Sequence, residues 1–169
     1  PTCPESYPHD VVDGEEVDQV PVEEVREANP DERRMIHAIL ELEDVAAREV
    51  MVPRVDIVAV AAGTPLAEAA ARMAQEGHSR LPVYEDSVDN IIGIVHARDI
   101  LQSMTAGAGS LVALADIVRP AWFIPDTKPI DQLLKELREQ GVSIAVVVDE
   151  YGGVEGILTI EDLLEEIVG

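Results

Sequence analysis

The residues best suited to bind a ligand lie in two short segments that are far apart in the chain. Thr159-Ile160-Glu161-Asp162 follows an apolar run and opens an amphipathic stretch, which predicts a strand turning into a helix. The Asp162 carboxylate there offers two acceptor oxygens to a pair of ribose hydroxyls, and Thr159 supplies a hydroxyl beside it. Free N–H groups at a helix start suit a phosphate. In the second segment, Arg80 has the fork geometry that matches phosphate oxygens.

Each of these residues also has an ordinary structural interpretation. Asp162 can cap its helix, Thr159 can be a hydroxyl at a strand end, and Arg80 can pair with one of the many surface acids. A binding role therefore depends on whether the fold brings the two segments to one cleft.

The chain repeats one pattern twice, which bears directly on that question. Gly77–Glu85 returns as Gly141–Asp149, 64 positions later, and Gly93–Asp99 returns as Gly156–Asp162, 63 positions later. A period this long indicates two similar lobes that share a core and a pseudo-twofold axis. The cleft between two such lobes is a natural ligand site.

Each unit is predicted as β-α-β-β-α, with continuous apolar strands covered by helices, so the fold class is α/β (α+β). The predicted elements of the first unit are a strand over Val55–Val60, a helix over Leu66–Glu76, strands over Leu81–Tyr84 and Ile91–His96, and a helix from Asp99. Those of the second unit are a strand over Trp122–Pro125, a helix over Ile130–Gln140, strands over Ile144–Val148 and Val154–Leu158, and a helix over Ile160–Ile167.

The predicted organisation has four parts: a mobile acidic linker over 1–29, an amphipathic connecting helix over 30–47, and repeated units over 48–106 and 107–169. Asn29 can cap the connecting helix, and Pro30 fits its first turn.

Composition excludes several classes of function. With 34 acidic and 12 basic residues the net charge is −22, which disfavours nucleic acid and anionic membranes as partners. The single cysteine, Cys3, permits no internal disulfide and indicates the reducing cytosol, and no apolar stretch approaches the length of a membrane span. The four histidines lack metal-ligand spacing, and no P-loop or Gly-x-Ser-x-Gly motif occurs, so we do not expect an enzyme.

The doubled pattern resembles a tandem pair of CBS domains, the cystathionine-β-synthase type of regulatory module. Four segments more narrowly resemble the CorC/CNNM family of membrane proteins related to magnesium and cobalt efflux, also called hemolysin-like: Glu32–Ile36, Arg48–Arg54, Asp149–Gly153 and Gly156–Gly169. The resemblance covers roughly residues 30–169. It implies two CBS motifs packed as one module, at the cytoplasmic face of the plasma membrane. The family's membrane domain and small C-terminal domain are missing from this sequence.

In the family that the chain resembles, the Thr-x-x-Asp motif belongs to an adenosine-nucleotide site. The resemblance implies that Thr159, Ile160 and Asp162 bind the nucleotide together with residues of the other unit: Val52, His78, Ser79, Arg80, Leu81 and Pro82. Leu81 and Pro82 would offer apolar surface to adenine. The symmetry-related site is expected to be degenerate, because His96 replaces threonine. Asp99 could still hold a ribose there, with Arg98 as its cation.

We expect ATP rather than AMP or ADP, accompanied by Mg²⁺, because phosphates must enter a strongly negative protein. The expected function is an adenine-nucleotide-binding regulatory module for magnesium and cobalt transport. Its expected partners are a second copy, in a homodimer through CBS pairs, and the membrane-embedded domain of the same protein. Two alternatives stay open: a structural dimerisation module with vestigial pockets, and a divalent-metal buffer.

Overall fold

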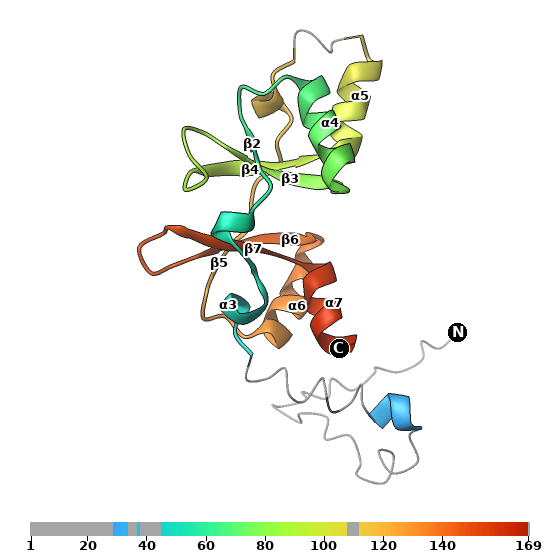
Figure 1. Cartoon of the computed structure of the whole chain (residues 1–169), viewed down its shortest axis with the longest axis vertical. Coiled ribbons are helices and arrows are strands. Elements are labelled where there is room, and N and C mark those ends of the chain that lie inside the picture. Colours follow the sequence, from blue (N-terminus) through green and yellow to red (C-terminus); the bar gives the residue numbers. More distant parts are fainter. Residues whose placement is uncertain (1–28, 34–36, 38–44, 108–111, 169) are drawn as a thin grey trace, which may run out of the picture.

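The computed structural model describes residues 29–33, 37, 45–107 and 112–168. These residues form two lobes, one above the other in Figure 1, and each lobe has a β-sheet covered by helices. The two sheets face each other in the middle of the molecule, and the helices lie on their outer faces.

The first lobe has a three-stranded sheet in the order β2-β3-β4. Its elements are β2 (Val60–Ala61), α4 (Leu66–Glu76), β3 (Arg80–Tyr84), β4 (Ile91–His96) and α5 (Ala97–Thr105). Strand β2 runs parallel to β3, and β3 is antiparallel to β4 with Arg80 opposite His96.

The second lobe has a four-stranded sheet in the order β1-β7-β6-β5. Its elements are α3 (Ala47–Val50), β1 (Val52–Pro53), β5 (Phe123–Pro125), α6 (Ile130–Gln140), β6 (Ile144–Val148), β7 (Val154–Thr159) and α7 (Ile160–Val168). Strand β5 runs parallel to β6, and β6 is antiparallel to β7 with Ile144 opposite Thr159. Two 3₁₀ turns complete the fold: η2 (Arg54–Asp56) and η3 (Leu114–Asp116).

Each lobe takes an edge segment from the other half of the chain. Val52 of β1 pairs with Ile157 of β7, so the start of the first unit completes the second sheet. In the same way, Arg119, near the start of the second unit, forms an isolated bridge with Ile94 of β4. Glycine makes both approaches possible, because a Cβ on Gly93 would lie 2.5 Å from the Arg119 carbonyl and one on Gly156 would meet the Val52 carbonyl.

Three apolar clusters hold these layers together. One lies between the first sheet and its helices, and includes Leu66, Leu81 and Ile100. A second lies between the second sheet and its helices, with Leu133 and Leu158 wholly buried. The third joins the two sheets, and its buried members are Ile91, Val146 and Val154. Because aliphatic burial is the main favourable term in folding, the inter-sheet cluster binds the lobes into one unit.

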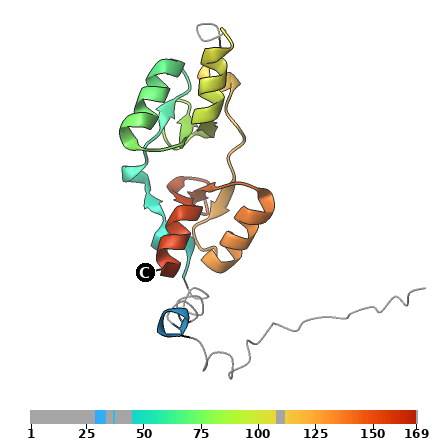
Figure 2. The same ribbon diagram turned by 90° about the vertical axis from the view of Figure 1, so that its right-hand side faces the viewer.

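The repeat appears in space as a pseudo-twofold arrangement. Seen along its axis in Figure 2, α4 and α5 of the upper lobe are related to α6 and α7 of the lower lobe by a half-turn. Both α4 and α6 end at a left-handed glycine, Gly77 at φ +72° and Gly141 at φ +64°, which any residue with a Cβ would adopt at a cost. The predicted β-α-β-β-α order of each unit is confirmed.

Two predicted elements differ from the structure. The strand expected over Val55–Val60 is wrong for most of its length, because Arg54–Asp56 form the η2 turn and only Val60–Ala61 pair with β3. The connecting helix expected over 30–47 falls largely outside the described residues. Within them, 30–33 and 37 are helical, whereas Ala46 is extended and bridges Pro129. Asn29 does cap the helical residues, since its side chain accepts the N–H groups of residues 31 and 32.

Candidate functional site

A cavity of about 320 Å³ lies between the two lobes and gathers most of the predicted site residues. The segment Gly77–Pro82, from the end of α4 into β3, forms one part of its lining, and Thr159 and Asp162 form another. Val52 of β1 also lines it. Eight predicted residues therefore meet in one place: Val52, His78, Ser79, Arg80, Leu81, Pro82, Thr159 and Asp162.

Thr159 and Asp162 form a reciprocal cap at the start of α7. The backbone N–H and the hydroxyl of Thr159 both donate to Asp162 Oδ2, at 2.8 and 2.6 Å, and the Asp162 N–H donates to Thr159 Oγ1 at 3.2 Å. This is a capping box, so the ordinary structural role considered for both residues is present. The Ile160 N–H donates to the Ser143 carbonyl at 3.0 Å. The expectation that these N–H groups are free to hold a phosphate is therefore wrong for Ile160 and Asp162.

Arg80 supplies the guanidinium at the cavity. Its Nε atom is the buried side-chain polar atom that lacks a hydrogen-bond partner among the described residues. A buried polar group without a partner is costly, and in a native structure it calls for a water or a ligand. The alternative role of Arg80, pairing with a surface acid, is absent from the ion pairs of the described residues.

The remaining lining contains residues outside the predicted set of ligand-binding residues. Val58, Ile144 and Ile157 widen the apolar wall that Val52 and Leu81 begin, while Gly77, Asp56, Ser143 and Glu161 add polar groups. Asp56 and Val58 were missed because residues 55–60 were expected to form a regular strand. The η2 turn instead carries this segment along the cavity.

The chain matches a known protein family at two places. The family description "CBS domain" matches the chain twice, over residues 47–106 and 114–169. The chain belongs to the CBS domain family.

Two relatives of this CBS pair match most of its length. It is 43% identical over 141 residues to a UPF0053 protein of Mycobacterium tuberculosis, covering 82% of this chain and 32% of that protein. It is 38% identical over 154 residues to the magnesium and cobalt efflux protein CorC of Pasteurella multocida, covering 88% of this chain and 51% of that protein. The chain thus spans about a third to a half of the length of these relatives.

A solved structure is similar to this CBS pair in both fold and sequence. The CBS domain of the bacterial CNNM/CorC family Mg²⁺ transporter in complex with ATP is 44% identical, with a TM-score of 0.78. The match covers 83% of this chain and 99% of that one. The CBS pair is therefore a member of the CNNM/CorC transporter family, and this family membership supports a role other than catalysis. None of the helices in the described part of the chain has the length and apolarity needed to span a bilayer.

The cavity of this CBS pair is rich in acid. Asp56, Glu161 and Asp162 bring three carboxylates to the lining, against the single guanidinium of Arg80. Phosphate groups would meet net negative charge here unless a cation came with them. Groups of three or more His, Cys, Asp or Glu able to hold a metal by themselves are absent from the described residues.

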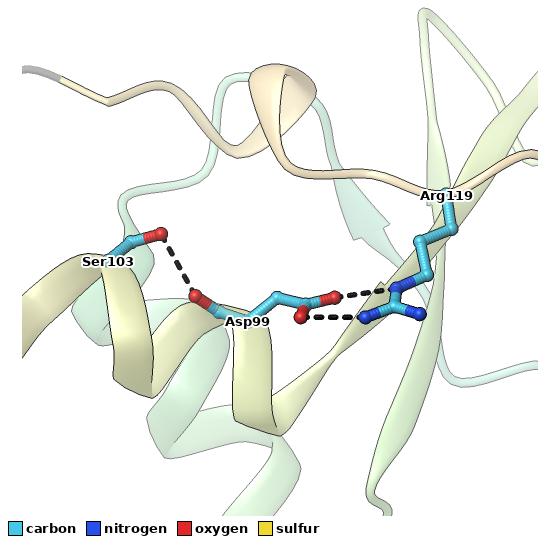
Figure 3. Close-up of polar contacts among 3 residues, drawn as sticks. All are labelled: Asp99, Ser103 and Arg119. Carbon is cyan, nitrogen blue, oxygen red and sulfur yellow. Dashed lines mark hydrogen bonds and ion pairs between the residues drawn. The ribbon is translucent and has the colours of Figure 1, made fainter.

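Two predicted site residues lie outside the cavity lining. Ile160 packs against the apolar cluster that contains Leu163. Asp99 is held by Arg119, a residue that the sequence analysis did not name. Arg119 Nε and Nη2 donate to Asp99 Oδ2 and Oδ1, each at 2.8 Å (Figure 3). The Ser103 hydroxyl in Figure 3 bonds the Asp99 backbone carbonyl at 2.9 Å and leaves the carboxylate to Arg119.

Charge at Asp99 perturbs its neighbours. The hydrogen bonds from Arg119 hold the pKa of Asp99 below its ordinary value. Burial, then the positive charges of Arg119 and Arg80, lower the pKa of His96, which keeps its imidazole neutral at pH 7. Asp99 therefore lies in a cationic surrounding. The signal for Arg119 in the sequence is that Val52-Pro53 and Arg119-Pro120 each stand just before the first predicted strand of their unit.

Proposed function

We propose that this CBS pair binds an adenine nucleotide, ATP with Mg²⁺, in the cavity between its lobes. The observation that carries the proposal is the meeting of Arg80 from the first lobe with Thr159 and Asp162 from the second in one partly apolar cavity. The ATP complex of the similar CNNM/CorC CBS domain supports the choice of ligand.

The donor and acceptor set fits a nucleotide. The cap of α7 uses Asp162 Oδ2, and a carboxylate has further lone pairs that can accept ribose hydroxyls. Arg80, with its unpartnered Nε, is the cation for a phosphate. Leu81, Ile144 and Ile157 give an apolar surface against which adenine can stack. A cavity of about 320 Å³ lies at the lower end of the range for small-molecule sites.

Magnesium belongs to the proposal because of the charge balance at the cavity. Mg²⁺ in nucleotide sites is usually held by one or two carboxylates together with the phosphates. Asp56 and Glu161 are the lining carboxylates outside the α7 cap, so they are the residues that would assist it. Chelation of Mg²⁺ is expected to weaken ATP binding more than AMP binding.

The proposed role is regulation of a CorC-like magnesium and cobalt transport protein from the cytoplasmic face of the plasma membrane. The chain covers 51% of CorC from Pasteurella multocida, so the rest of such a protein would supply the membrane domain. In the proposed organisation, 1–29 is a linker, 30–47 connects to the membrane domain, and 48–106 and 107–169 are the two motifs. Nucleotide can regulate transport only through different affinities for two arrangements of the module.

We further propose a homodimer through the helical face. Leu101 on α5 and Leu164 on α7 occupy equivalent positions in the repeat and are 63% and 47% exposed. Met104 and Val168 extend the same apolar stripes, and a groove of about 350 Å³ runs between α4 and α5 beside Leu101. Exposed apolar patches of this kind are typical of protein interfaces. Two related stripes on one pseudo-symmetric face suit a second copy of the chain.

Calorimetric titration of ATP with excess Mg²⁺ tests the nucleotide site. We expect the wild type to bind in the micromolar to low-millimolar range and Asp162→Asn to lose at least tenfold in affinity. Thr159→Ile should also abolish binding, because it removes the hydroxyl and narrows the cavity. Asp99→Asn is the matched control and should bind ATP as the wild type does.

The alternative functions predict different results. If the wild type releases no heat and gains no thermal stability with ATP, the result supports a dimerisation module with vestigial pockets. Binding of Mg²⁺ or Ca²⁺ at equal strength with and without nucleotide supports the metal-buffer alternative. Either outcome rejects the nucleotide proposal.

Sedimentation equilibrium tests the homodimer. Leu101→Glu is expected to shift the molecule toward monomer, because it places a charge in the proposed interface. Val55→Glu is the control, since Val55 is 87% exposed but lies on the η2 turn. A wild type that stays monomeric at high concentration contradicts the proposal.

A further inference from the structure

The repeat builds a second copy of the strand-to-helix turn that carries Asp162. We call the end of β7 with Thr159 and Asp162 the Asp162 half-site, and the end of β4 with His96 and Asp99 the Asp99 half-site. In each, the first N–H of the following helix donates to a serine carbonyl: Ala97 to Ser79 at 2.9 Å and Ile160 to Ser143 at 3.0 Å. The backbone therefore presents both carboxylates in the same way.

The residue that faces each turn from the neighbouring segment differs. Val52 pairs with Ile157 in β7, and Arg119 pairs with Ile94 in β4, 63 positions earlier in the repeat. Both carbonyls approach equivalent glycines, as a Cβ on Gly93 or Gly156 would meet them. Arg119 is thus the structural counterpart of Val52. With valine at this position, the aspartate keeps its hydrogen bonds in the helix cap. With arginine, the longer side chain forms an ion pair with the aspartate.

Arg119 uses both oxygens of its aspartate. The two N–H···O bonds are 2.8 Å each and form the bidentate geometry that makes arginine-carboxylate pairs strong and directional. Beneath the guanidinium, the Asp99 side chain is only 18% exposed, while Arg119 remains 48% exposed. A ribose would have to replace two charge-assisted bonds with two neutral ones.

We propose that Arg119 determines the nucleotide stoichiometry of the chain, by closing the Asp99 half-site to the ribose of a second nucleotide. The inference rests on the proposed function of the Asp162 half-site. It assigns to Arg119 a specificity role: one nucleotide binds per chain because one of two equivalent carboxylates is already occupied by the chain's own cation.

The test is the number of nucleotides bound per chain, measured by equilibrium dialysis with Mg-ATP and with adenosine. Adenosine is included because it presents the ribose without phosphate charge. In β6, Ile144 occupies the position that Arg80 occupies in β3, so a second site would lack the equivalent cation for a phosphate. The wild type should bind one ligand. Arg119→Val, which installs the residue found at Val52, should bind a second. His96→Thr added to it should tighten the second site, by restoring a hydroxyl beside Asp99.

Double variants separate this inference from the proposed function. Arg119→Val/Asp162→Asn should retain one adenosine, and adding Asp99→Asn should remove it. Arg119→Lys should stay at one ligand per chain, because it keeps a cation at Asp99. Circular dichroism melts confirm that each variant is folded.

Three results overturn the inference. In the first, the wild type binds a second ligand that Asp99→Asn removes. In the second, folded Arg119→Val binds no second ligand. In the third, folded Arg119→Val/Asp162→Asn binds no ligand. A wild type that binds nothing rejects the proposed function. If Arg119→Val then binds one adenosine that depends on Asp99, the role of Arg119 still stands. If it binds none, both proposals fail.

Discussion

At the end of β7, Asp162 accepts two hydrogen bonds from Thr159 beside a cavity, whereas at the end of β4 the equivalent Asp99 is held by Arg119. The backbone of the two turns is the same, down to the serine carbonyl that each helix contacts and the glycine behind each paired segment. The divergence lies in the side chains around each carboxylate. A duplicated scaffold thus keeps its packing while its ligand chemistry changes by a few substitutions.

The largest expected effect tests whether the two glycines play the same role. A Cβ on Gly156 would meet the Val52 carbonyl and lie 2.7 Å from the Met51 sulfur, and one on Gly93 would lie 2.5 Å from the Arg119 carbonyl. Gly156→Ala and Gly93→Ala should each lower the free energy of unfolding by roughly 1–3 kcal/mol, the usual cost of overpacking. Urea denaturation measures both.

The matched control is Gly63→Ala, where no atom lies within 4 Å of the added Cβ. Its stability should stay close to that of the wild type. Gly156→Ala should in addition weaken ATP binding, because Val52 must move, while Gly93→Ala should not. An equal loss of ATP affinity in Gly156→Ala and Gly93→Ala would contradict the difference between the two half-sites.

A smaller effect distinguishes the two helix caps. Thr159→Ala removes the hydroxyl that bonds Asp162 and should cost about 1 kcal/mol of stability, as the loss of an N-cap does. His96 makes no side-chain cap bond, so His96→Ala should cost less than about 0.5 kcal/mol. Thermal denaturation at pH 7 compares them. A larger loss for His96→Ala would show that its side chain stabilises the fold in another way.

The smallest effect is electrostatic. Burial comes first and Arg119 second among the causes that lower the pKa of His96 below 6.5, so Arg119→Val should raise that pKa. The unfolded chain binds the proton more readily than the folded one, and stability therefore falls as pH drops from 6.5 through the folded pKa. Arg119→Val should reduce this loss. NMR titration of His96 measures the shift, with Arg98→Gln as a control that should move it less.

Much of the fold could be predicted from the sequence because its signals are local. Apolar runs bounded by glycine gave α4, β3, β4, α6 and β6 within a residue of their observed bounds. The repeat then indicated that the Arg80 and Asp162 segments would meet, and the cavity contains both. Short, isolated strand pairings were harder to predict from the sequence. The η2 turn at Arg54–Asp56 overlaps the start of the predicted strand, and the apolar residues that follow it suggested a longer strand than the two paired residues of β2.

The partner of Asp99 was missed in the sequence analysis for a related reason. The nearest cation in sequence is Arg98, but adjacent residues on a helix do not face each other. Arg119 lies 20 residues away and reaches Asp99 because its backbone bridges Ile94. Such a contact depends on how a linking segment docks on a sheet edge, and periodicity carries no information about that docking.

Because each lobe takes an edge segment from the other half of the chain, the two halves depend on each other when the molecule unfolds. The chain runs from the second sheet at Val52 to the first sheet and back again at Phe123, so neither half of the sequence contains a complete lobe. A fragment holding only the second unit would lack Ala47, which is wholly buried, and would expose the edge of β7. The two halves are therefore expected to unfold in a single cooperative transition, and an ancestor with one unit would have needed a second copy to lend it an edge.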